Sequence, residues 1–140
     1  MSILKQIYEY KKEFVKTRKI SIPLDGVIKE SNKYKPKGFI SKIETDILNN
    51  NISIIGELKK ASPSAGIIFS DENDYHNIAN TYENNGISCL SILTDEKYFK
   101  GSDKDLEKIR SKVKLPIIRK DFIVDRYQLF ESKMLGADCI

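Results

Sequence analysis

Residues 52–66 read ISIIGELKKASPSAG, and this stretch decides how the rest of the chain is interpreted. Its first half is rich in β-branched isoleucine, which predicts a buried strand over residues 52–58. Side chains of a strand alternate between its two faces, so Glu57 and Lys59 project on the same side at the carboxyl end. A buried strand rarely ends with two charges on one face unless they meet each other or a ligand. A surface ion pair at a solvated strand end is the alternative.

The composition is that of an ordinary soluble domain. The chain has 140 residues, of which 40% are hydrophobic and 31% are charged. No run of about 18 apolar residues and no apolar signal core occurs, so we expect no membrane span and a cytoplasmic location. The cysteines, Cys89 and Cys139, have no CxxC spacing and lie in apolar strand-like contexts, which favours buried thiols over a disulfide or a metal site. The only histidine, His76, is expected to be an unremarkable surface side chain.

The net charge of +4 is concentrated in the first third of the chain. Residues 1–51 hold 11 lysines and arginines against 6 acidic residues, whereas residues 52–140 hold 13 against 14. A basic segment of this kind could attract phosphates or nucleic acid. However, the acidic residues are interleaved with the lysines and no nucleic-acid motif is present, so we interpret the segment as solvated helices and expect no nucleic-acid partner.

The spacing of apolar residues divides the chain in two. Residues 1–51 predict a helical extension, with an amphipathic helix over residues 3–18, a short helix opened by Pro23 and a helix over 39–48. From residue 52 onward, strands and helices alternate. The predicted strands cover residues 52–58, 87–94 and 115–120, with a fourth opening at 137; the predicted helices cover 74–85, 103–113 and 125–135. The segments 60–73 and 95–101 are expected to be loops.

This alternation predicts a parallel α/β sheet with right-handed crossovers. Repeating units of about 30 residues fit a (β/α)8 barrel or a doubly wound sheet. The first strand is not followed by GxGxxG, which weighs against a dinucleotide-binding fold.

The carboxyl ends of parallel strands meet at one edge of a sheet, where active sites of such folds lie. Glu57 and Lys59 follow the first strand, and Lys120 ends the third. These three side chains are therefore expected to converge on one pocket. There they could provide a proton donor or a cationic site for carboxylate and phosphate groups. The serines and glycine of 62–66 could add hydroxyl and N–H donors.

Three motifs resemble the indole-3-glycerol-phosphate synthase family, in its order and at its spacing. They are IIGELKKASPSAG at 54–66, LSILTDEKYFKGS at 90–102 and LPIIRKDFIVDRYQLFESKMLGAD at 115–138. Residues 3–19 also resemble the helix that precedes the barrel in this family. The resemblance implies a (β/α)8 TIM barrel, of which residues 52–140 would be three β/α units and the start of strand four.

The resemblance implies a carbon–carbon lyase of tryptophan biosynthesis without metal or organic cofactor. Its phosphorylated small-molecule substrate, 1-(2-carboxyphenylamino)-1-deoxyribulose 5-phosphate, closes an indole ring and loses CO2 and water. Lys120 matches the lysine held to be the general acid, Lys59 a lysine near the substrate carboxylate, and Glu57 the glutamate that orients both. The matched substrate-binding positions are one polar contact and three apolar wall residues: Ser62, Leu93, Phe99 and Phe122.

The departures from the family pattern concern what the chain lacks. Ala65 stands where many relatives carry lysine. The family's general base, a polar Asn, an Arg and the phosphate-binding loops would all follow Ile140. We therefore expect the 140-residue chain alone to be inactive and marginally stable, as an N-terminal part of the synthase. The alternative is a non-catalytic half-barrel that self-associates through its open strand edges.

Overall fold

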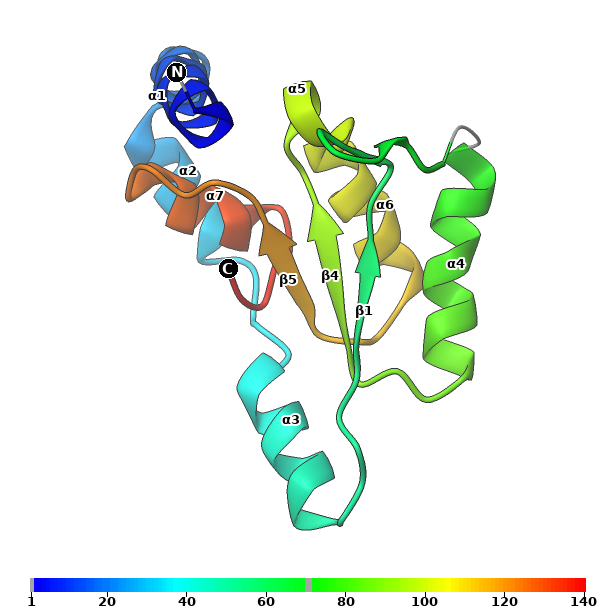
Figure 1. Cartoon of the computed structure of the whole chain (residues 1–140). Helices are drawn as coiled ribbons and strands as arrows, with labels where there is room; N and C mark the ends of the chain where they lie inside the picture. Colours follow the sequence, from blue (N-terminus) through cyan, green and yellow to red (C-terminus); the bar gives the residue numbers. More distant parts are fainter. Residues whose placement is uncertain (1, 70–71) are drawn as a thin grey trace.

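The computed structural model describes residues 2–69 and 72–140, which form a small parallel sheet with helices along one side and a helical N-terminal segment (Figure 1). The sheet has the strand order β1-β4-β5 and both of its strand pairs are parallel. Its strands are β1 (Ile55–Leu58), β4 (Cys89–Leu93) and β5 (Ile117–Lys120). A single parallel bridge between Ile118 and Cys139 extends the sheet beyond β5, where the sequence predicts a fourth strand.

Three helices precede the sheet, close to the predicted positions. They are α1 (Ile3–Ser21), α2 (Leu24–Ser31) and α3 (Phe39–Leu48), and Pro23 is the residue before α2. The later helices are α4 (Glu72–Asn84), α6 (Asp103–Lys112) and α7 (Tyr127–Met134). The predicted cap Asp125 acts from two residues before α7, because its carboxylate accepts a hydrogen bond from Tyr127 N at 2.8 Å.

Two segments expected to be loops contain regular structure. Within 60–73, β2 (Ala61–Ser62) and β3 (Gly66–Ile67) pair as a short antiparallel hairpin. Within 95–101, the single helical turn α5 (Glu96–Phe99) follows Asp95, whose side chain accepts a hydrogen bond from Tyr98 N. Such short elements carry no hydrophobic period, which is why apolar spacing did not predict them.

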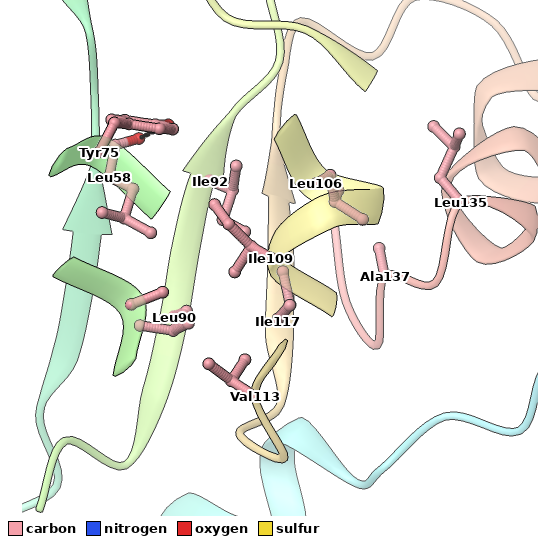
Figure 2. Close-up of a cluster of buried hydrophobic side chains, with 11 residues drawn as sticks. Leu58, Tyr75, Leu90, Ile92, Leu106, Ile109, Val113, Ile117, Leu135 and Ala137 are labelled. Atoms are coloured by element: carbon pink, nitrogen blue, oxygen red, sulfur yellow. Dashed lines mark hydrogen bonds between the residues drawn. The ribbon is translucent and has the colours of Figure 1, made fainter. Parts of the chain in front are cut away.

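The main core fills the space between the sheet and helices α4 and α6 (Figure 2). Leu58, Leu90, Ile92 and Ile117 point from the strands toward these helices and are almost completely buried. The helices contribute buried apolar side chains to the same layer: Tyr75, Ala79, Leu106 and Ile109. Residues on the other face of the same strands, such as Glu57 and Lys120, therefore point away from α4 and α6.

Two glycines let these layers approach closely. A Cβ at Gly56 would lie 2.6 Å from the Tyr82 ring, so glycine allows α4 to pack directly on β1. A Cβ at Gly101 would lie 2.1 Å from the Leu93 carbonyl oxygen. Glycine at 101 therefore lets the segment after α5 fold back on the end of β4, which keeps α5 beside the strand ends.

A second apolar cluster joins the N-terminal helices to α7. Val15 of α1, Val27 of α2 and Tyr127 of α7 are buried together. The Tyr127 hydroxyl donates a hydrogen bond to the Ile22 carbonyl oxygen at 3.0 Å. Helices α1 and α2 are thus packed against α7, and in Figure 1 α1 lies near the carboxyl end of β5.

Candidate active site

Three charged side chains meet at the carboxyl ends of β1 and β5, and we call them the open triad: Glu57, Lys59 and Lys120. Glu57 accepts a hydrogen bond from Lys59 Nζ on Oε1 at 2.8 Å and one from Lys120 Nζ on Oε2 at 2.5 Å. One carboxylate thus joins two ammonium groups that come from strands on either side of β4. Lys120 is 56% exposed and Glu57 30% exposed, so the triad is accessible to a solute.

The two ammonium groups keep Glu57 ionised. Burial by itself would raise the pKa of the Glu57 carboxyl, but the hydrogen bonds from Lys120 and Lys59 outweigh it and hold that pKa below its usual range. The carboxylate is therefore an acceptor that orients both lysines at neutral pH. With two positive charges against one negative charge, the open triad has a net positive charge and suits an anionic ligand.

Apolar side chains form the wall beside the open triad. The Phe99 and Phe122 rings lie 6.1 Å apart between centroids, tilted by 42°, and Leu93 ends the central strand. A cavity of about 260 Å3 lies between these groups. Its lining combines the open triad, the apolar wall and two aspartates: Glu57, Lys59, Leu93, Asp95, Phe99, Lys120, Asp121 and Phe122. Six of the seven residues singled out in the sequence therefore line one cavity.

Ser62 is the seventh residue, and it does not line this cavity. It lies in β2 of the hairpin, and its Oγ accepts a hydrogen bond from Ala65 N at 3.0 Å. The Ser62 and Ser64 hydroxyls also lie 3.4 Å apart. The hydroxyl thus closes its own turn in this structure, and its role toward a ligand stays a prediction.

The sequence did not predict the buried charges at the cavity, which are the two aspartates of its lining and a lysine that pairs with both. Asp95 and Asp121 both lie within 3 Å of Lys11 Nζ, at 2.9 and 2.7 Å, and all three side chains are at most 2% exposed. Lys11 comes from α1, more than 80 residues away in the chain. The signal available in the sequence was a lysine that shares the helix face of Ile7 and Val15, where charge is costly unless it is paired.

The interpretation of His76 as a surface side chain is wrong. His76 is buried, and its Nε2 lies 3.1 Å from Asp105 Oδ1. Lys60, directly after the open triad's Lys59, also bonds Asp105 Oδ1, at 2.9 Å. Helix α4 packs against α6, and His76 links the two helices through the same Asp105 carboxylate that Lys60 bonds at the base of the hairpin.

The two cysteines differ in their surroundings. Cys89 is buried, as the sequence predicts, and burial raises the pKa of its thiol to about 11. Cys139 is only partly buried, and the two thiols are not joined. Over residues 2–69 and 72–140 we find no group of three or more His, Cys, Asp or Glu side chains that could hold a metal ion. Within the same residues, no helix is long and apolar enough to cross a membrane.

The geometry suits an aromatic carboxylate or a similar planar anion. The two ammonium groups would attract the negative charge, and the phenylalanine pair would cover a flat ring. An ammonium near a carbonyl oxygen that becomes an alkoxide can also donate a proton to it. The cavity therefore combines two ammonium groups, one carboxylate that bonds both of them, and an apolar wall.

Comparison with known proteins gives the same family along the whole chain. The family model for indole-3-glycerol phosphate synthase matches residues 4–140. Proteins of that name from Clostridium kluyveri, over 141 residues, and from Azospirillum brasilense and Legionella pneumophila strain Paris, over 139 residues, are each 43% identical to this chain. Each match covers 99% of this chain but only 52 or 53% of the relative, so the chain spans about half the length of the curated relatives it matches. The chain belongs to the indole-3-glycerol phosphate synthase family.

Proposed function

We propose that this chain supplies one wall of the active site of an indole-3-glycerol-phosphate synthase. The substrate would be 1-(2-carboxyphenylamino)-1-deoxyribulose 5-phosphate, which closes to indole-3-glycerol phosphate with loss of CO2 and water. The observation that carries the proposal is the open triad beside the phenylalanine pair, in a chain of this family.

Lys120 is proposed as the general acid. As the aromatic ring carbon attacks the ketone carbon, negative charge develops on the ketone oxygen, and the Lys120 ammonium gives it a proton. The hydrogen bond to Glu57 holds the ammonium at the rim of the cavity. Glu57 is thus an orienting group and Lys120 the group that touches the reacting atom.

Lys59 and the apolar wall are proposed to act on the carboxylate that leaves as CO2. Lys59 pairs with this carboxylate when the substrate binds, while Leu93, Phe99 and Phe122 pack on the anthranilate ring. An apolar surrounding disfavours the charged carboxylate and favours its loss as a neutral molecule. Ser62 is proposed as a polar contact, which requires its hydroxyl to turn from Ala65 toward the substrate.

The proposal includes the family's (β/α)8 barrel. Residues 1–51 would be the helical extension, and residues 52–140 the first three β/α units and the start of strand four. The general base and the phosphate-binding groups would come from the part of the family's length that the chain does not span. We also propose a cytoplasmic location and a reaction without cofactor.

The test joins the 140-residue chain to the part of the Clostridium kluyveri relative that lies outside the match. Formation of indole-3-glycerol phosphate, followed by its fluorescence, should occur with the fusion and not with the 140-residue chain alone. Lys120→Ala in the fusion should lower kcat by roughly two to four orders of magnitude, because the proton donor is lost. Lys108→Ala, an exposed lysine of α6, should stay within about twofold of the parent.

Two results would contradict this assignment. A Lys120→Ala change of less than about threefold would remove Lys120 from the mechanism. An inactive fusion, together with concentration-dependent dimers of the 140-residue chain, would favour the alternative of a half-barrel that self-associates. The observation that favours this alternative is the exposure of an apolar side chain on the outer strand β1, where Ile55 is 47% exposed.

A further inference from the structure

We propose that Lys11 of α1 is a positioning residue for the cavity, acting through Asp95 and Asp121 on Phe99 and Lys120. The inference rests on the proposed function, since it assigns the N-terminal helix a part in the same site. We call Lys11, Asp95 and Asp121 the buried cluster. It adds to the site a residue from outside the strands and from outside the three motifs at 54–66, 90–102 and 115–138.

The first step is that Lys11 connects two strand ends. Its ammonium lies 2.9 Å from Asp95 Oδ2, two residues after β4, and 2.7 Å from Asp121 Oδ1, directly after β5. The ammonium also lies 5.0 Å from the centre of the Phe14 ring, and the side chain is almost fully buried. One ammonium group thus lies between the two carboxylates and pairs with both.

The second step is that each carboxylate holds a residue of the cavity wall. Asp95 Oδ1 accepts a hydrogen bond from Tyr98 N at 2.7 Å, which caps the turn that carries Phe99. Asp121 Oδ1 accepts one from Phe122 N at 2.7 Å, and Asp121 is the neighbour of Lys120. The two rings lie beside each other in the cavity wall, and each is therefore held next to one of the two carboxylates that Lys11 joins.

The third step is the charge balance of the buried cluster. Burial would lower the pKa of Lys11, but Asp121 and Asp95 outweigh it and keep the ammonium charged. Asp121 Oδ2 also accepts a hydrogen bond from Thr94 Oγ1 at 2.7 Å and lies 3.6 Å from an Arg119 nitrogen. Without Lys11, two buried carboxylates would face each other with less positive charge between them, and they would move apart.

The consequence is a specific loss of geometry at the cavity. A displacement of about 1 Å in a positioned group can cost on the order of a hundredfold in rate. We expect Lys11→Met, in the fusion described above, to lower kcat about 10- to 100-fold while KM changes less than about threefold. Lys12→Met is the matched control, because Lys12 is 43% exposed and pairs only loosely with Glu9 at 3.7 Å; it should leave kcat within about twofold.

A second readout does not depend on turnover. In NMR spectra of the 140-residue chain, contacts between the ring protons of Phe99 and Phe122 should weaken in Lys11→Met and persist in Lys12→Met. Contacts between the methyl groups of Leu90 and Ile117 in the main core should persist in both variants. A purely structural role would weaken the core contacts and the ring contacts together, and that result would overturn the proposal.

The outcomes separate this inference from the proposed function. If the parent fusion has no activity, the proposed function fails, whereas the ring contacts still test the positioning. If Lys11→Met does not fold, Lys11→Gln replaces it, because a neutral amide of similar length can still donate to one carboxylate. Unchanged kcat and unchanged ring contacts in a folded Lys11 variant would refute the positioning role.

Discussion

The open triad and the buried cluster both pair lysine ammonium groups with carboxylates near the ends of neighbouring strands, yet only the open triad is exposed to solvent. In the open triad the side chains of Lys59, Glu57 and Lys120 are 34%, 30% and 56% exposed. In the buried cluster none exceeds 2%. This difference in solvent exposure indicates two roles for charged side chains at strand ends. Accessible charge can meet a substrate, whereas enclosed charge can only hold its neighbours in place.

Adjacent residues of β5 show how the sequence creates this difference. Arg119 and Lys120 follow each other, so their side chains project on opposite faces of the sheet. Arg119 points to the helix-covered face and bonds Glu131 at 2.9 Å and Asp103 at 2.8 Å. Arg18 of α1, which is 29% exposed, bonds the same two carboxylates, so two guanidinium groups balance two carboxylates around the buried Arg119. Lys120 points to the opposite face and lines the cavity.

The largest expected effect comes from removing Arg119, the buried cation of β5. Arg119→Met should lower the free energy of unfolding by about 3–5 kcal/mol, because the buried Glu131 and the partly buried Asp103 are left with Arg18 as their one shared cation. Lys120→Met, one residue along, should change it by less than about 1 kcal/mol, since its pair with Glu57 is half exposed. Urea unfolding of both variants in the same fusion measures the difference. Equal losses would mean that the faces of β5 do not differ as described.

The sequence predicted the helices and strands whose apolar residues are regularly spaced. In the part of the chain that the structure describes, the helices of eight or more residues and the three strands of the parallel sheet lie where the spacing of apolar residues predicts them, with bounds that differ by a few residues. The hairpin at 61–67 and the turn at 96–99 are held by hydrogen bonds rather than by an apolar face. Apolar spacing has no information about such elements.

The site was predictable where residues lie at strand ends, because parallel pairing brings those ends together. Glu57 and Lys120 could be placed on one cavity from the element order alone. Lys11 and His76 could not, since their partners are set by how helices pack on the sheet. A lysine inside a helix is expected to be exposed to solvent unless its partners elsewhere in the chain are known. The partners of Lys11, Asp95 and Asp121, lie more than 80 residues from it in the sequence.

A smaller effect is expected from Thr94, which hydrogen-bonds both Asp121 of the buried cluster and Arg119. Thr94 Oγ1 donates to Asp121 Oδ2 at 2.7 Å and accepts from Arg119 Nε at 3.0 Å, so it connects the buried cluster with Arg119. Thr94→Val keeps the shape and removes both hydrogen bonds, which should cost about 1–3 kcal/mol in the free energy of unfolding. Thr81→Val, at an exposed position of α4, should cost less than about 0.5 kcal/mol. A Thr94→Val cost equal to that of Thr81→Val would argue against any coupling through Thr94.

The smallest expected effect concerns the open triad and the pH dependence of the stability that Glu57 contributes. The pKa of Glu57 is below its usual value of 4.5 in the folded chain, so near pH 4 the unfolded state binds more protons at this group. The stabilisation from Glu57 is therefore present above about pH 4.5 and is lost as the pH falls through the lower folded pKa.

Because the open triad is in contact with water, this stabilisation should stay below about 1 kcal/mol. The measurement compares the urea midpoints of the fusion and of its Glu57→Gln variant at pH 7 and at pH 3. The variant should be slightly less stable at pH 7, and the difference should shrink at pH 3. Concentrated salt at pH 7 should shrink it as well, since mobile ions screen an exposed pair. A difference that grows on acidification would require a Glu57 pKa raised by burial, and the carboxylate could then not orient Lys59 and Lys120 as proposed.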